Sequence, residues 1–142
     1  PYTTLGLVFL LEGNDEQAIA ALQSAVSRDP SAVNWADLGL ALALANRPPE
    51  ALTALEKASQ QPLPTPHALR VYYRLMNLYM RAGDALKAAG AAAKMVSARD
   101  GLPVWEYQLD AIQGTAYGQR LAREIQAIAD ALSTADAAQV AP

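Results

Sequence analysis

The stretch LGLVFLLEGNDEQAIAALQSAVSRDP, residues 5–30, contains two apolar helical patterns separated by the short break GND. A single amphipathic helix would not need that break. The proline at residue 30 ends the second pattern, because its ring fixes φ and removes a backbone donor. The stretch therefore predicts two helices joined by a tight turn, which is a helix hairpin.

The same arrangement recurs twice further along the chain. The second copy reads WADLGLALALANRPPEALTALEKASQQPLP, and the third reads YYRLMNLYMRAGDALKAAGAAAKMVSARDG. The turn residues Gly13, Asn46 and Gly83 are 33 and 37 positions apart, which straddles the roughly 34-residue period of one helix-hairpin repeat class. Because a single hairpin cannot bury its apolar face alone, the sequence predicts a stack of hairpins.

The composition favours helices over the whole chain. The 142 residues are 52% hydrophobic and 18% charged, which suffices for one compact domain, and Ala and Leu lose little on entering a helix. The longest apolar run, LGLVFLL, is far shorter than the roughly 20 residues that a bilayer crossing requires. We therefore expect an all-α chain without a membrane span. The absence of cysteine excludes a disulfide framework and a thiolate metal site.

Residue by residue, the three copies resemble the tetratricopeptide repeat (TPR) family. The family pattern asks for a large residue, Leu-Gly and an apolar residue in the first helix, and for Ala, a large apolar residue, Ala and Pro along the second. The first copy fills these positions with Tyr2, Leu5, Gly6, Phe9, Ala18, Leu22, Ala25 and Pro30. The second copy fills them with Trp35, Leu38, Gly39, Leu42, Ala51, Leu55 and Ala58. The third copy is looser, with Met76 in place of the small residue.

This resemblance implies a right-handed α-solenoid of stacked antiparallel helix hairpins. We expect one domain over residues 1–133, followed by a flexible tail over residues 134–142. Beyond the third copy the pattern weakens, and we interpret it as a degenerate hairpin whose last helix covers the exposed end of the stack. The expected units are 2–30, 33–64 and 68–101, with the capping hairpin at 103–133.

The resemblance also implies a binding surface, since the first helices of TPR units line a concave groove. The first two units would present a mostly apolar wall there, and the third a basic and polar stripe. The expected groove residues are Leu7, Leu10, Ala36, Leu40, Ala43, Arg70, Tyr73, Arg74, Asn77 and Arg81.

The charge distribution singles out the third unit. Residues 67–99 carry six basic and one acidic side chain, whereas residues 1–66 carry three and seven, and residues 100–142 carry two and six. The local positive charge favours a partner with an acidic segment, held by Arg70, Arg74 and Arg81 on about one helical face. The alternative is that Arg74 and Arg81 pair with acidic side chains of the flanking units or are solvated.

Other functional classes lack support in the sequence. There is no P-loop, dinucleotide fingerprint or metal-ligand spacing. We interpret the single histidine, His67, as a residue at the start of a helix. We therefore expect no enzyme, no cofactor and no metal. The sequence pI near 5.0 argues against nucleic-acid binding. Thr3 and Leu7 stand where some TPR domains place the Lys and Asn that hold a chaperone tail, which argues against that class of partner.

The sequence thus predicts a non-catalytic protein-interaction module that binds a protein or peptide in its groove. The alternatives are a homo-oligomerising component of a larger assembly, such as one of the cell envelope, or the regulatory arm of a multidomain protein. The last alternative arises because the chain does not begin with Met. The Ala-rich composition is typical of bacterial proteins, and both the bacterial cytoplasm and the periplasm fit it.

Overall fold

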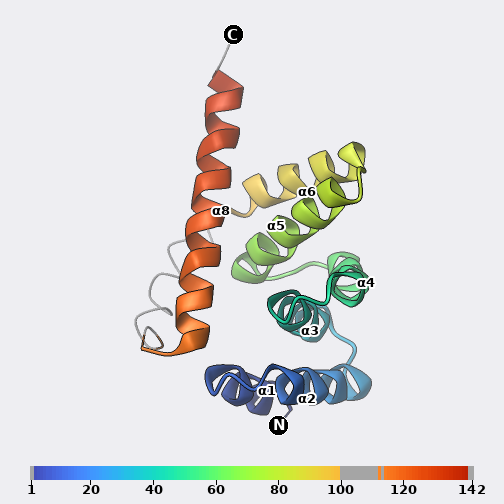
Figure 1. Ribbon diagram of the computed structural model, residues 1–142. Helices are drawn as coiled ribbons and strands as arrows, with labels where there is room; N and C mark the ends of the chain where they lie inside the picture. Colours follow the sequence, from blue (N-terminus) through green and yellow to red (C-terminus); the bar gives the residue numbers. More distant parts are fainter. Residues whose placement is uncertain (1, 100–111, 113, 141–142) are drawn as a thin grey trace.

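The computed structural model describes residues 2–99, 112 and 114–140. In these residues every regular element is a helix, and helices α1 to α6 form three antiparallel hairpins stacked one on the next (Figure 1). The hairpins are α1 with α2, α3 with α4, and α5 with α6. Their bounds are Tyr2–Leu11, Asp15–Arg28, Ala32–Leu44, Pro48–Ser59, Thr65–Arg81 and Ala85–Ser97. The predicted all-α solenoid is confirmed.

The three hairpin turns share one backbone geometry. Gly13, Asn46 and Gly83 have φ angles of 81°, 59° and 76°, in the left-handed region that glycine and asparagine enter at the lowest cost. The next residue then donates its backbone N–H to the carbonyl five residues earlier, which satisfies a carbonyl at the helix end. These bonds are Asn14 to Phe9 at 2.8 Å, Arg47 to Leu42 at 3.0 Å and Asp84 to Tyr79 at 2.9 Å.

Close approach of the two helices depends on glycine in the first two hairpins. A Cβ atom on Gly39 would lie 2.7 Å from Cγ of the buried Leu55, and Gly6 meets a leucine of α2 in the same way. In the third hairpin the large and the small residue exchange helices. Met76 of α5 stands seven residues before the turn glycine, as Gly39 does before Asn46, and Ala92 of α6 stands nine residues after it, as Leu55 does. This exchange explains why the third copy departs from the repeat pattern.

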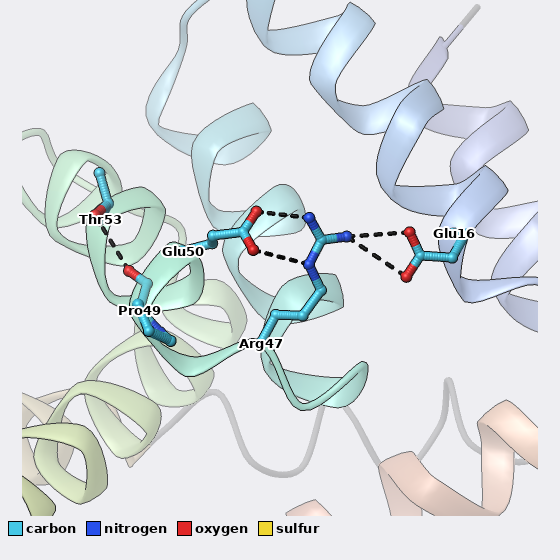
Figure 2. A network of polar contacts seen from close by, with 5 residues as sticks. All are labelled: Glu16, Arg47, Pro49, Glu50 and Thr53. Atoms are coloured by element: carbon cyan, nitrogen blue, oxygen red, sulfur yellow. Dashed lines mark hydrogen bonds and ion pairs between the residues drawn. The ribbon is translucent and has the colours of Figure 1, made fainter.

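Arg47 links the first and second hairpins at their turns (Figure 2). It donates from Nη2 and Nε to the two oxygens of Glu50 at 2.6 and 2.9 Å, and from Nη1 to Glu16 Oε2 at 3.1 Å. The hydrogen bonds from Arg47 lower the pKa of Glu50. All three side chains are substantially exposed, so the network contributes little to stability.

Helix α8, Ala116–Val140, lies lengthwise along the stack and contacts α1, α5 and α6 (Figure 1). This differs from the predicted cap, because α8 reaches both the first and the third hairpins. The helix also extends past residue 133, where the sequence predicts its end. A continuous stripe of buried side chains requires a long surface to cover it. That stripe consists of Tyr117, Leu121, Ile125, Ile128 and Leu132. Residues 103–111 of the predicted capping hairpin lie outside the described part of the chain.

Tyr79 on α5 gives the fold a pH dependence that can be measured. Its hydroxyl donates to Glu56 Oε2 on α4 at 2.8 Å. Burial, followed by this hydrogen bond and the charge of Glu56, raises the pKa of Tyr79 from 10.0 to about 12. Because the folded pKa is the higher one, the contribution is fully present below about pH 10 and is lost as the pH rises towards 12.

We therefore expect Tyr79→Phe to lose less stability than the wild type between about pH 10 and pH 12. The measurement is the free energy of unfolding in urea at a series of pH values for both proteins. Parallel pH profiles would contradict the assignment, since the other tyrosines are common to both chains.

Candidate partner-binding site

The residues predicted to face the groove lie on α1, α3 and α5, the first helices of the three hairpins. In the apolar half only Leu7 has a large exposed fraction, 46%. Leu10, Ala36 and Leu40 are buried instead, because they pack into the core between the hairpins. The accessible apolar wall is therefore narrower than the sequence predicts.

A cavity of about 220 Å³ opens beside Leu7, and we call it the Leu7 cavity. Leu10 and Leu40 line it from α1 and α3, and Arg70 lines it from α5. Tyr117 of α8 also lines it, so the last helix forms part of the site. Four of the predicted groove residues are thus brought together, with an aromatic residue from a helix that the groove prediction did not include.

A second pocket, of about 180 Å³, lies further along α5, and we call it the Arg81 pocket. Its lining includes the remaining predicted residues except Ala36. These are Ala43, Tyr73, Arg74, Asn77 and Arg81. The lining is mainly polar, as the sequence predicts for the third unit.

A shallow hollow adjoins the Arg81 pocket and shares its Ala43, Tyr73 and Arg74. Its other side is formed by α8, which contributes Arg120, Arg123 and Glu124. Arg81 and Arg123 are exposed, and neither forms an ion pair with any residue that the structure describes. Two solvated guanidinium groups therefore lie beside adjoining concave surfaces.

The arginines nearest α8 already hold a carboxylate of this chain. Arg70 donates from Nε to Glu124 Oε2 at 2.7 Å, and Arg74 donates from Nε to Glu124 Oε1 at 2.7 Å. The Glu124 side chain is 1% exposed, and those of Arg70 and Arg74 are 10% and 26% exposed. The alternative stated from the sequence, pairing with a flanking acidic side chain, thus holds for Arg74, and Arg70 is paired in the same way.

The charge of Arg70 is stabilised despite its burial. Burial alone lowers the pKa of a guanidinium group, but the charge of Glu124 and the contact with Tyr117 more than offset it, so the pKa of Arg70 is raised. Arg70 therefore stays cationic near neutral pH, as guanidinium groups in proteins do. A carboxylate beside it is held by charge as well as by geometry.

Two further ion pairs attach α8 to the stack. Near its start, Arg120 donates to both oxygens of Asp15 on α2 at 2.9 and 3.0 Å. Near its other end, Asp136 accepts two hydrogen bonds from Arg99 at 2.6 and 3.1 Å. These hydrogen bonds from Arg99 lower the pKa of Asp136. The first hairpin, α5 and the end of the third hairpin are thus all linked to one helix.

The groove prediction missed Tyr117, Arg120 and Glu124, which come from α8. One sequence signal could have found Glu124: it stands three residues after Leu121 and four before Ile128, inside the apolar stripe of the helix. A glutamate on a buried face requires a cationic partner. Residues 67–99 contain most of the basic side chains of the chain.

The Leu7 cavity and the Arg81 pocket offer apolar contact and positive charge to a partner.

The single histidine forms no metal site with the side chains that the structure describes. His67 Nε2 lies 3.3 Å from Asp37 Oδ1, and no cluster of three or more metal-ligating side chains occurs in the described residues. The helices described here include none that is long and apolar enough to cross a membrane.

The solved structures that are similar to this chain include two of MamA. A crystal structure of MamA aligns with a TM-score of 0.59 and 24% identity, over 95% of this chain and 78% of that chain. Another crystal structure of MamA protein aligns with the same TM-score and identity, over 99% and 76%. No protein-family model and no curated protein matches the sequence. The chain therefore has the fold of a TPR-like helical repeat, and membership of the TPR family stays a prediction.

Proposed function

We propose that this chain is a non-catalytic protein-interaction module that holds an acidic partner segment against its concave face. The observation that carries the proposal is the Arg81 pocket together with the hollow beside it. Arg74 and Arg81 of α5 line the pocket, and Arg74 lines the hollow together with Arg123 of α8. The whole chain, in contrast, has a net charge of −3. Positive charge concentrated in a concavity of an acidic protein attracts and orients an acidic ligand.

The lining of the Arg81 pocket suits a peptide. A guanidinium group can bind a carboxylate with two parallel hydrogen bonds. Asn77 offers both a donor and an acceptor to a peptide backbone, and Tyr73 offers a flat apolar surface with a hydroxyl. Helical repeats commonly bind their partners on extended concave surfaces of this kind.

Charge reversal of Arg81 should test this proposal. We expect Arg81→Glu to bind a fluorescein-labelled peptide of alternating Glu and Ala about tenfold more weakly than the wild type, since repulsion replaces attraction at the pocket. Fluorescence anisotropy at low salt measures the affinity, and higher salt should reduce the difference. The melting temperature should hardly change, because Arg81 is exposed.

Lys87→Glu is the matched control, because it makes the same charge change on the exposed start of α6, outside both pockets. Equal weakening by the two variants would show that only net charge matters. Failure of the wild type to prefer the Glu peptide over a Lys counterpart would count against the proposed function itself.

Self-association is the second candidate, and the surface of α1 favours it. Leu5, Leu7 and Val8 are 43%, 46% and 41% exposed, which is unusual for neighbouring large apolar side chains on one helix. Sedimentation over a wide concentration range separates the two candidates. A monomer at all concentrations would leave partner binding as the function.

A further inference from the structure

A carboxylate of this chain already occupies two of the arginines predicted to bind a partner. Both oxygens of Glu124 accept from arginines on successive turns of α5, at 2.7 Å each. A buried carboxylate between two arginines is the interaction that the groove would make with an acidic partner. Here the carboxylate comes from the chain itself.

We propose that α8 is an exchangeable internal occupant of the concave face, and that the partner is an amphipathic helix whose glutamate replaces Glu124 on Arg70 and Arg74. The inference rests on the proposed function and adds its regulation. Arg74 couples the two, because it holds Glu124 and also lines the open Arg81 pocket. An acidic partner that binds at Arg81 is therefore next to Arg74, the arginine that also holds α8 through Glu124.

The fit of α8 to the stack is incomplete at one end. The Leu7 cavity lies between Tyr117 of α8 and the leucines of α1 and α3, and Leu7 is 46% exposed. A void in an apolar contact forfeits both burial and dispersion attraction. A partner helix that places a larger apolar side chain there would bury surface that α8 leaves open.

The two outer attachments of α8 are also more exposed than the central one. The side chains of Arg120 and Asp15 are 26% and 25% exposed, and those of Arg99 and Asp136 are 41% and 49% exposed. Glu124 is the one fully enclosed charge of the helix in the described residues. Departure of α8 removes this carboxylate from Arg70 and Arg74, so a partner that supplies a carboxylate in its place is favoured over one that does not.

The chemistry of the partner follows from α8. It is a helix with a glutamate three residues after one apolar side chain and four before another, as Glu124 stands to Leu121 and Ile128. A synthetic peptide with the sequence of residues 116–136 meets this description and serves as the probe. A second peptide with Gln in place of Glu124 is its control.

The experiment measures binding of both peptides to the full chain and to its Glu124→Gln variant. The variant should bind the Glu peptide about tenfold more tightly than the wild type, because its own helix no longer competes through a carboxylate. The Gln peptide should not bind the variant more tightly in this way, because it has no carboxylate to place between Arg70 and Arg74. Asp136→Asn removes the same charge from the same helix at another ion pair, and it should change the affinity little.

A second measurement uses the wild type alone and does not depend on the variant folding. Amide hydrogen exchange is followed by NMR on the isotopically labelled chain with and without excess Glu peptide. Exchange in α8 should accelerate when the peptide binds, while α3 and α4 stay protected. This separates exchange of the helix from simple attraction of the peptide to a more basic surface.

Three results would overturn the inference. The Glu peptide could bind while α8 stays fully protected, or Asp136→Asn could raise the affinity as much as Glu124→Gln. The wild-type chain could also form a dimer in sedimentation, with α8 exchanged between copies, which would identify a second copy as the occupant. If the peptide of alternating Glu and Ala still binds through Arg81 in these cases, the proposed function stands and its regulation by α8 does not.

Discussion

Gly39→Leu is expected to lower the free energy of unfolding by about 1–3 kcal/mol, because it overpacks the contact between α3 and α4. Even a Cβ atom at this position would lie 2.7 Å from Leu55 Cγ and 3.1 Å from the Leu55 backbone nitrogen. Leu55 is 0% exposed, so it can yield only against the close-packed neighbours of the core. The second hairpin also contacts both of its neighbours, and separation of its helices would weaken both interfaces.

Urea unfolding followed by circular dichroism measures the effect, and Gly90→Leu is the matched control. Gly90 is on α6 with nothing within 4 Å of a Cβ atom placed there. Replacement of a helical glycine at an open position should be neutral or stabilising. Similar unfolding curves for the wild type and Gly39→Leu would contradict the hairpin packing.

Glu124→Ala is expected to have the largest effect of any single substitution on the docking of α8. Removal of one member of a buried ion pair costs about 3–5 kcal/mol, because it leaves the opposite charge buried without compensation. Here Arg70, 8% exposed, would lose the carboxylate that holds it. The loss of stability cannot exceed the free energy that holds α8 on the stack. Hydrogen exchange in α8 should therefore accelerate while the three hairpins remain folded.

Two comparisons test the reason for this effect. Asp136→Ala removes an exposed carboxylate from the same helix and should change stability little. Replacement of Arg70, Arg74 and Glu124 together by Met should recover most of the loss, since no buried charge remains. If the triple variant were as unstable as Glu124→Ala, the cause would be packing around Glu124 and not the loss of its carboxylate from Arg70.

The repeat was predictable because its determinants are local. Gly13, Asn46 and Gly83 each take a positive φ that few other residues accept, and the hydrogen bond that closes each turn spans only five residues. Gly39 marks the close approach of two helices that are adjacent in sequence. A period of this kind is visible in one sequence without knowledge of long-range contacts.

The groove was predicted less completely, for a physical reason. The arginine stripe of α5 identified Arg70, Arg74 and Arg81 as neighbours on one face, but their environment depends on a helix about fifty residues away. Leu10 and Leu40 were expected on an accessible wall and are buried. Helical periodicity shows that a side chain faces inward or outward on its own helix, and it does not show what covers that face.

The sequence by itself thus determined the all-α class, the three hairpins with their turns, and the concentration of positive charge on the third unit, because each depends on residues close together along the chain. Only the tertiary structure decided where α8 lies, and with it which arginines are open to a partner. The apolar stripe from Tyr117 to Leu132 requires a surface to cover it. The choice of that surface depends on the ion pairs of Glu124, Arg120 and Asp136 with residues distant in sequence, which no local pattern specifies.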